Sequence, residues 1–397
     1  MDRKQALQKA LSNVDQDYIV AIRRELHEYP EIQFDLPRTI GVVKRELESM
    51  QIPYTEKYGK SSVVAAINEE KTAFTIGIRA DMDALPITEK TGLPFQSKIE
   101  GKMHACGHDA HTAMLLGTAK ALMPLRDMLD CRIKLLFQPY EEGVQGAKCM
   151  VADGVMDDID IILGLHVENW LDSGCIGVCP GESMAASNPI TVTFSGKSAH
   201  ATLPQSGHDA LAMAVKAYLG IQTMLVREID PFKRFVCSIS ALNAGKTHNV
   251  IADQAEMKIS LRTYETELNN FIESRIQMIC RNAAAELGGT SEYRGGMAAY
   301  PIVNDPTISQ AVLAAAEKVV GPDKIVEMRP KMSSEDFSQY LTKKPGVFFR
   351  LGTRSEVKGC ITLPHNSDFM LDEDAMQYGS KTCVQFIFDN QHGIGKP

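Results

Sequence analysis

Five short runs of almost uninterrupted apolar and β-branched residues constrain the fold of this 397-residue chain more than any other feature. The runs are VVAAI (63–67), FTIGIR (74–79), RIKLLF (132–137), IDIILGL (159–165) and VFFRL (347–351). Such strands are usually buried on both faces, as in parallel sheets covered by helices. Segments with helical periodicity lie before or between them, at 15–28, 38–49, 110–123 and 143–151. We therefore expect an α/β domain with a mostly parallel sheet from the first half and the last hundred residues.

The middle of the chain, from Asn188, follows a different order. Its expected elements are a strand at 190–194, a helix at 209–226, strands at 235–245 and 255–264, a helix at 267–287 and a strand near 291–295. This βαββαβ order suits an antiparallel sheet with helices on one face. No long linker is present, so we expect short joints near 186 and 299. The predicted domains are a discontinuous catalytic domain, 1–185 with 299–397, and an inserted domain, 186–298.

Composition excludes several classes of function. The net charge of −8 comes without a basic run, which argues against binding of nucleic acid or of anionic membranes. The polar N-terminus and the lack of a stretch of about 20 apolar residues predict a cytoplasmic protein without a membrane span. Nine scattered cysteines fit reduced thiols better than a disulfide framework.

The densest chemistry lies in His104-Ala-Cys106-Gly-His108-Asp109-Ala-His111. A thiolate and an imidazole two residues apart can reach one cation where the chain turns, and Gly107 gives the turn its freedom. A cluster of partly buried polar groups is the alternative for this segment taken alone.

Three further segments carry candidate ligands. Glu141 and Glu142 follow the run 132–137, and neighbouring side chains on extended backbone point to opposite sides. One carboxylate could therefore bind a metal while the other faces the substrate as a general base. His166 ends the next predicted strand, and His365 follows the last one. Each residue alone fits a structural or surface role, but together they reach the same edge of the predicted sheet, which favours a metal site.

Seven motifs resemble those of one family. They are RRELHEYPE (23–31), GIRADMDALPI (77–87), MHACGHDAH (103–111), FQPYEEG (137–143), LGLHV (163–167), SGKSAHATLPQSGHDA (195–210) and SSEDFSQY (333–340). Over essentially its whole length the chain resembles the M20 metallopeptidases and amidohydrolases, in the branch of aminoacylases, hippurate hydrolases and auxin-conjugate hydrolases. The resemblance implies a zinc-peptidase-like α/β catalytic domain and an inserted, ferredoxin-like α+β domain that serves as lid and dimerisation domain.

The same resemblance implies two divalent metal ions per subunit, Zn²⁺ or Mn²⁺ with Co²⁺ as a further candidate. The implied ligands are Cys106, His108, Glu142, His166 and His365. Cys106 would bridge the ions as a thiolate. Glu141 would take the proton of a water held between them and later protonate the departing amine. Candidates for orienting the ligand imidazoles, or for capping turns, are Asp81, Asp83 and Asp109.

In the inserted domain, the resemblance assigns His200 to stabilising the oxyanion across a dimer interface. Asn249 and Arg262, expected on strands of that domain, are similar to groups that hold a substrate carboxylate, which the Arg fork suits. The alternative for Arg262 is a pair with a surface acid. A homodimer or higher homo-oligomer through residues 186–298 is implied.

Two positions depart from the family pattern. Tyr140 stands where a small residue commonly precedes the Glu pair, and Ala252 replaces a usual proline. Neither departure removes a ligand, so they bear on substrate preference. Three hypotheses follow: an amidohydrolase of small N-acyl-L-amino acids, a dipeptidase or carboxypeptidase with the same metals, and a non-catalytic, metal-stabilised binding protein.

Overall fold

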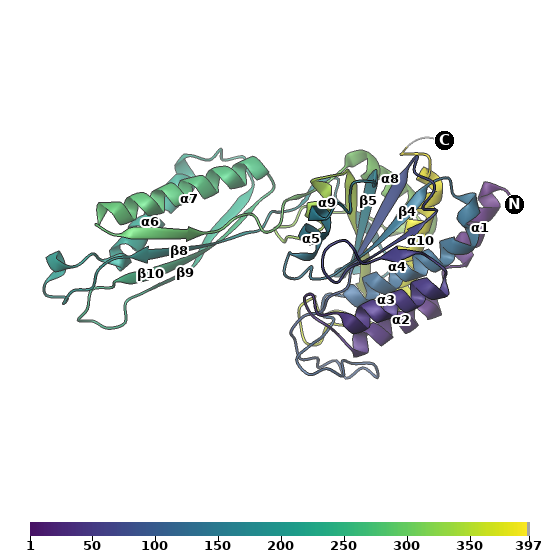
Figure 1. The fold of residues 1–397 in the computed structure, drawn as a ribbon, viewed down its shortest axis with the longest axis horizontal. Coiled ribbons are helices and arrows are strands. Elements are labelled where there is room, and N and C mark those ends of the chain that lie inside the picture. Colours follow the sequence, from purple (N-terminus) through teal and green to yellow (C-terminus); the bar gives the residue numbers. More distant parts are fainter. Residues whose placement is uncertain (395–397) are drawn as a thin grey trace. The chain divides into compact units, whose positions relative to one another are not determined.

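The computed structural model describes residues 1–394 and divides into two compact units (Figure 1). Unit 1 comprises Met1–Ser183, Val303–Arg329 and the residues from Asp336 onward, and unit 2 comprises Met184–Ile302 and Pro330–Glu335. The predicted catalytic domain contained residues 330–335, whereas these residues group with unit 2. The assignment of a catalytic role to one unit stays a prediction.

Unit 1 is built around an eight-stranded sheet in the order β1-β2-β4-β3-β5-β14-β6-β13. Its strands are β1 (Tyr54–Thr55), β2 (Val63–Ile67), β3 (Thr75–Asp81), β4 (Arg132–Gln138), β5 (Ile161–Asp172), β6 (Ile176–Val178), β13 (Ile325–Glu327) and β14 (Gly346–Arg354). The central pairs β4–β3, β3–β5 and β5–β14 are parallel. The five predicted strands are β2, β3, β4, β5 and β14, and the prediction of a mostly parallel α/β sheet is confirmed.

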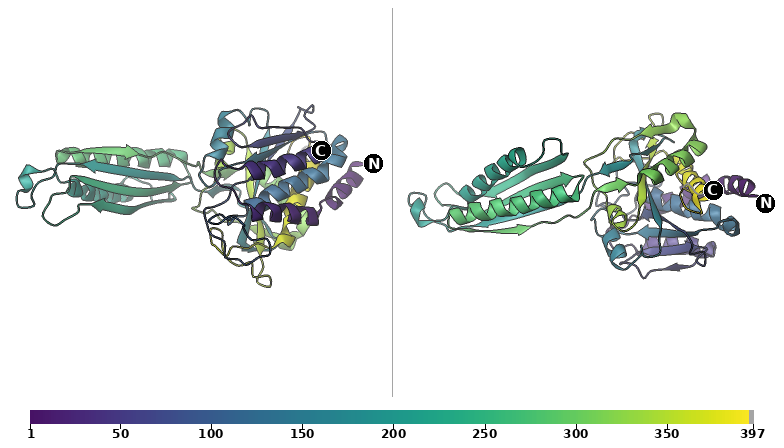
Figure 2. Two further views of the ribbon diagram at one scale, coloured as in Figure 1. Left: turned by 60° about the horizontal axis from the view of Figure 1, so that its bottom comes forward. Right: turned by 90° about the horizontal axis from the view of Figure 1, so that it is seen from above.

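The α-helices of unit 1 are α1 (Arg3–Ser12), α2 (Gln16–Glu28), α3 (Pro37–Ser49), α4 (His108–Leu122), α5 (Gly146–Ala152), α8 (Pro306–Val320), α9 (Ser338–Leu341) and α10 (Met376–Asn390). Helices α1, α2, α3, α4, α8 and α10 form one core with the sheet, as Figure 2 shows for those near the N-terminus, whereas α5 and α9 contribute no residue to this core. Short 3₁₀ helices are η1 (Met123–Met128), η3 (Pro322–Lys324) and η4 (Glu373–Ala375). Helix α4 is buried almost all round because α2 and α10 pack against it. Its fixed position matters because it begins at a candidate ligand, His108.

Unit 2 has the predicted βαββαβ order. Its elements are β8 (Asn188–Ser195), η2 (Pro204–Ser206), α6 (Ala210–Arg227), β9 (Phe235–Ala244), β10 (Gln254–Thr263), α7 (Thr266–Glu286) and β11 (Thr290–Arg294). The antiparallel sheet has the order β11-β8-β10-β9. Helices α6 and α7 cover one face of this sheet (Figure 1), so alternate residues of β10 are buried, and the residues between them are polar and at least partly exposed. A separate two-stranded sheet pairs β7 (Gly181–Met184) with β12 (Ile302–Asn304).

Two predicted positions are wrong. Strand β5 continues to Asp172, so His166 lies inside a strand and not at its end. Asn249 lies in the loop between β9 and β10, not on a strand. Both errors arise because strand ends depend on pairing with neighbours: β14 pairs with β5 well beyond His166. Among residues 1–394, no helix has the length and apolarity that crossing a bilayer requires.

Candidate metal centre and active site

The loop that carries Cys106 and His108 is shaped by Gly107. This residue caps α4 with a φ of 86°, in the left-handed region that favours glycine. A Cβ at this position would lie 2.4 Å from Cγ2 of Val167. Gly107 therefore lets the loop approach β5 closely, and the helix begins at His108 immediately afterwards.

The second source of site residues is the sheet of unit 1. In the parallel register, Asp81 lies beside Gln138, and His166 lies beside Arg350. Asp81 and Gln138 end their strands, where ligand sites of open α/β sheets form, whereas His166 and Arg350 lie inside β5 and β14. The sheet thus contributes polar side chains from neighbouring strands.

The five predicted ligands form two triads that share a thiol. The donor atoms of Cys106, His108 and His166 lie within 4.8 Å of one another, and so do those of Cys106, Glu142 and His365. The loop of His365 is held to the 104–111 loop by a hydrogen bond from the His365 amide to the Ala105 carbonyl, 2.8 Å long. The structure therefore brings together residues from four segments that are distant in sequence.

Hydrogen bonds within residues 1–394 do not use all donor atoms of these triads. His166 Nδ1 donates to the Val167 carbonyl at 2.6 Å, so Nε2 carries the lone pair and faces the sulfur of Cys106, another candidate ligand, at 3.4 Å. Both ring nitrogens of His108 and Oε1 of Glu142 are buried without a hydrogen-bond partner among residues 1–394. Buried polar atoms without partners are costly. Divalent cations would satisfy them, so the residues present fit a metal centre.

The charged and titratable groups of the cluster also fit a bound cation. Burial and the nearby Glu142 raise the pKa of the Cys106 thiol well above its ordinary value, and burial raises the pKa of Glu142 to about 7. Burial opposes protonation of His108, but Asp81 and Cys106 raise its pKa well above the ordinary value. Asp81 thus favours positive charge at His108, whereas burial lowers the pKa of His166 well below its ordinary value and so favours its neutral ring; a bound cation would stabilise the thiolate and the carboxylate.

The Glu pair does not have the predicted geometry. Tyr140 has a φ of 47°, and the chain turns so that the Val144 amide donates to the Glu141 carbonyl at 2.7 Å. The expectation of opposite-facing side chains is wrong because it assumed extended backbone. Carboxylate oxygens of Glu141 and Glu142 and a ring nitrogen of His108 instead lie within 4.8 Å of one another.

Asp83 holds this turn in place. Its two oxygens accept hydrogen bonds from the amides of Glu141 and Glu142, at 3.0 and 3.2 Å. One of these oxygens also lies 3.3 Å from Nδ1 of His108. Asp83 therefore caps the Glu turn, one of the two roles expected for it, and lies close to the candidate ligand His108.

His111 shows how the structure selects among the histidines of the motif. Its Nδ1 is 2.6 Å from Asp81, and its Nε2 accepts the Val167 amide at 2.9 Å. Because both nitrogens are used, His111 is a structural residue rather than a ligand. Asp109 points away from the cluster, toward Arg23 and His27 at 2.8 and 2.7 Å. It fixes the first turn of α4.

Sequence reasoning missed a buried charge network beneath the site. Arg79 donates to Asp81 at 2.6 Å, to Asp336 at 3.0 Å and to Gln138 at 2.7 Å. Gln138 in turn donates to Asp336 at 2.8 Å. In the sequence, Arg79 and Asp336 belong to the GIRADMD and SSEDF motifs. Neither motif indicates which residue its charged side chain will contact.

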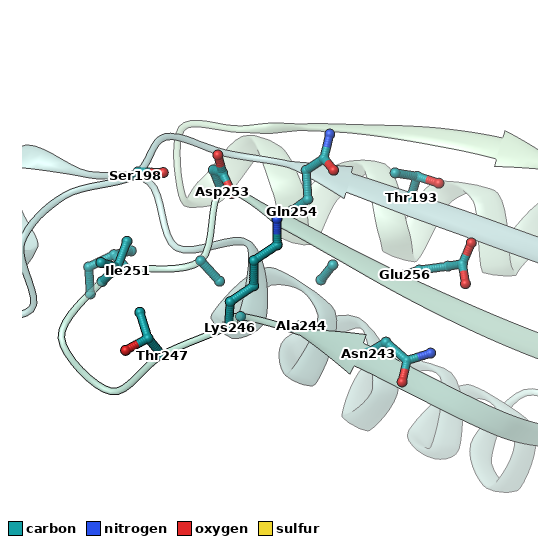
Figure 3. Close-up of a pocket in the computed structure, with 14 residues that line it drawn as sticks. Thr193, Ser198, Asn243, Ala244, Lys246, Thr247, Ile251, Asp253, Gln254 and Glu256 are labelled. Atoms are coloured by element: carbon teal, nitrogen blue, oxygen red, sulfur yellow. The ribbon is translucent and has the colours of Figure 1, made fainter.

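Unit 2 contains the remaining candidates. His200 is exposed in the loop after β8, and its segment pairs with Val250, so that the Ala201 amide donates to the Asn249 carbonyl at 3.0 Å. Near this loop, a hollow of about 720 Å³ is lined by residues that include Ser198, Lys246 and Thr247 (Figure 3). The side chains of His200 and Asn249 are not part of its lining.

Arg262 lies near the opposite end of β10. Its half-buried guanidinium donates to Ser334 Oγ at 3.0 Å, and burial lowers its pKa somewhat from the ordinary value. Within the described chain no carboxylate pairs with it, so the alternative of a surface ion pair is wrong. Eight residues of strand separate Gln254 from Arg262, which is about 26 Å at about 3.3 Å per residue. The structure thus groups His200 with Asn249 and separates both from Arg262.

A mixed α/β fold with a cluster of Cys, His and Glu side chains is typical of metal-dependent hydrolases. The model of Peptidase family M20/M25/M40 matches residues 77–389, and the chain belongs to this family, as its motifs suggested. It is 35% identical to Thermostable carboxypeptidase 1 of Saccharolobus solfataricus, over 96% of this chain and 97% of that protein. It is 36% identical to N-acetyl-L-cysteine deacetylase of Bacillus subtilis, over 90% of this chain and 84% of that protein.

Among solved structures, a Bacillus subtilis protein described as a dinuclear metal binding peptidase from the M20 family has a TM-score of 0.81 and 32% identity. The match covers 94% of this chain and 98% of that one. The protein is therefore a hydrolase that acts on amide C–N bonds, as predicted.

Proposed function

We propose that this protein hydrolyses the amide bond of N-acyl-L-amino acids with the help of two divalent metal ions. The observation that carries the proposal is the pair of donor triads that share Cys106, because one thiol between two sets of ligands suits a bridging role. The similarity to an N-acetyl-L-cysteine deacetylase supports an acylated amino acid as the substrate.

Each ion would have its own ligands in addition to the shared thiolate. His108 and His166 would hold one ion, and Glu142 and His365 the other. Zn²⁺ and Mn²⁺ both suit this set of sulfur, nitrogen and oxygen donors, with Co²⁺ as a third candidate. When bound, such ions polarise the substrate carbonyl and lower the pKa of water.

Glu141 would move the protons. It is almost completely buried, and the hydrogen bond from its backbone amide to Asp83 fixes its backbone. As general base it takes a proton from the attacking water, whose oxygen bonds to the amide carbon. As general acid it then gives that proton to the nitrogen as the C–N bond breaks. The products are a carboxylate and a free amino acid.

Arg262 would bind the carboxylate of the amino-acid product half. Its guanidinium pairs with no carboxylate among residues 1–394, and the adjacent Ser334 hydroxyl offers a second hydrogen-bonding group. A planar guanidinium fork matches a carboxylate in two parallel hydrogen bonds. A free carboxylate next to the scissile amide is common to N-acyl amino acids and to peptides at their C-terminus.

The separation within unit 2 supports a dimer. His200 and Arg262 lie too far apart along β10 to contact one small substrate from the same copy. They could do so only if two copies each contributed one of them. Helix α6 also exposes apolar side chains at helical spacing that a second copy could cover. These are Leu211, Val215, Tyr218, Leu219 and Val226.

Carboxypeptidase activity is the second candidate, favoured by the similarity to Thermostable carboxypeptidase 1. The same ions, general base and carboxylate-binding arginine would serve a peptide. The two candidates differ at the acyl side, where a dipeptide carries an ammonium group. A non-catalytic binding protein is disfavoured because Glu141 and all five candidate ligands are present.

The test is release of free amino acid from a panel of N-acetyl amino acids, N-benzoyl amino acids and dipeptides, resolved by chromatography. The enzyme is stripped with chelator and reloaded separately with Zn²⁺, Mn²⁺ or Co²⁺, and Glu141→Gln is the control. We expect metal-restored cleavage of acyl amino acids. A preference for dipeptides would support the second candidate, and a metal-loaded but inert protein would refute both.

The shared site is tested by mixing two inactive variants, His200→Ala and Arg262→Ala. If each substrate is contacted by both copies, equal mixing makes about half of the dimers heterodimers, each with one of its two sites intact, and activity recovers to about a quarter of wild type. If both side chains come from the same copy, mixing restores nothing.

A further inference from the structure

The exposed imidazole of His200 has a defined hydrogen-bonding partner on one side only. Its Nδ1 lies 2.7 Å from Oγ1 of Thr202 and 3.3 Å from the backbone nitrogen of Thr202, which donates to it. A backbone N–H can only donate, so Nδ1 must accept and carries no proton in this arrangement. In the neutral ring the proton is therefore on Nε2. Thr202 makes the far nitrogen of His200 a hydrogen-bond donor.

Asn249 has a comparable arrangement. Oγ1 of Thr247 donates to Oδ1 of Asn249 at 3.0 Å. The carboxamide oxygen is thereby occupied, and the Nδ2 amide group is left to donate outward. The two segments are paired through the Ala201 amide and the Asn249 carbonyl, so both side chains belong to one end of unit 2.

We propose that Thr202 and Thr247 are positioning residues that preset His200 and Asn249 as a pair of N–H donors for a negatively charged oxygen of the substrate. The inference deepens the proposed function and rests on it for the identity of that oxygen. Neither threonine touches the substrate; each acts through its neighbour two residues away.

Presetting matters because both side chains are exposed and can otherwise reorient. A neutral imidazole exchanges between two tautomers, and a carboxamide can rotate to present its oxygen. Either change would turn a donor into an acceptor facing the developing negative charge. Donors that are already oriented need no reorganisation when the charge forms, which is the basis of their contribution to catalysis.

The tautomer is measured directly, without any substrate. Long-range ¹H–¹⁵N spectra of protein labelled in its histidine rings distinguish a protonated from an accepting ring nitrogen. The chain has ten histidines, so a His200→Gln variant assigns the signal. In wild type, above the pH at which the ring loses its charge, we expect Nε2 to carry the proton. Thr202→Val keeps the shape and the backbone N–H, 3.3 Å from Nδ1, but removes the hydroxyl at 2.7 Å; because only the longer of the two contacts then holds Nδ1 as an acceptor, the Nδ1-protonated fraction should increase.

The second experiment measures kcat and KM with the substrate that the wild-type enzyme cleaves best. Thr202→Val and Thr247→Val should each lower kcat by about two- to tenfold, the effect of one hydrogen bond, with little change in KM. Thr202→Ser and Thr247→Ser retain a hydroxyl and should restore kcat. Both threonines are exposed in loops, so the variants should fold.

Two results would overturn the inference: a wild-type His200 protonated on Nδ1, or valine variants with wild-type kcat. Failure of the proposed function would look different. In that case acyl amino acids would be poor substrates, while the tautomer of His200 and its response to Thr202→Val would still be as described.

Discussion

Replacement of Gly107 by alanine should test what sets the geometry of the 104–111 loop, which carries the candidate ligands Cys106 and His108. A φ of 86° costs an L-residue about 1–2 kcal/mol. The new Cβ would also lie 2.4 Å from Val167 Cγ2, and forcing a methyl group into a packed site costs about 1–3 kcal/mol. Val167 cannot yield easily because it is fully buried and its amide donates to His111. We expect a total loss of about 2–5 kcal/mol of unfolding free energy.

Gly101→Ala is the matched control. Gly101 has a φ of 75°, but a Cβ added there would meet no atom within 4 Å, so this variant should lose only the backbone contribution of about 1–2 kcal/mol. Urea unfolding of the two variants can be followed through Trp170, the single tryptophan of the chain, which lies in β5 of unit 1. Bound metal is measured by mass spectrometry after reloading.

Gly107→Ala should also bind less metal than Gly101→Ala, because relief of the clash displaces Cys106 and His108, the residues on either side. Equal losses of stability and equal metal content in the two variants would refute the argument that the close approach to β5 sets the geometry of the ligands.

Three further predictions concern named side chains. Glu141→Gln should retain metal but lose about 10²- to 10⁴-fold in kcat, since the general base is gone; near-wild-type turnover would contradict its role. Cys106→Ala should bind less than the wild-type amount of metal, whereas Cys383→Ala, at a buried cysteine of α10, should bind the full amount in the same mass-spectrometric assay. Burial opposes ionisation of Asp109, but Arg23 and His27 hold its pKa well below the ordinary 3.8, so its carboxylate contributes stability above that pH and loses it as the pH falls toward the folded pKa. Asp109→Asn should therefore lower the free energy of unfolding by about 3–5 kcal/mol at neutral pH. The difference between the urea midpoints of the variant and the wild type should become smaller in acid.

Local patterns predicted the elements well. Continuous apolar runs identified β2 and β14, and alternation with helical periodicity predicted the parallel sheet. The βαββαβ order of unit 2 followed from the same reasoning. These features leave a pattern in residues close in sequence, so they can be predicted from one sequence.

Local patterns failed where the backbone leaves regular geometry. The turn at Tyr140 brings Glu141 and Glu142 to the same side, and no propensity rule predicts a positive φ for tyrosine. The end of β5 was misplaced because pairing with β14, not the local sequence, extends it. Both errors changed the geometry of the site without changing its list of residues.

The sequence by itself determined which residue types could form the site, because Cys106, His108, the Glu pair, His166 and His365 can be recognised from chemistry, position after strands and family motifs. Only the tertiary structure decided which side-chain nitrogens are left to bind a metal ion or a substrate. His111 is excluded as a ligand by Asp81 and the Val167 amide, and Arg262 is available because no acid lies beside it in the described chain. The physical reason is that availability depends on hydrogen-bond partners brought from distant segments, and these become neighbours only when the chain folds.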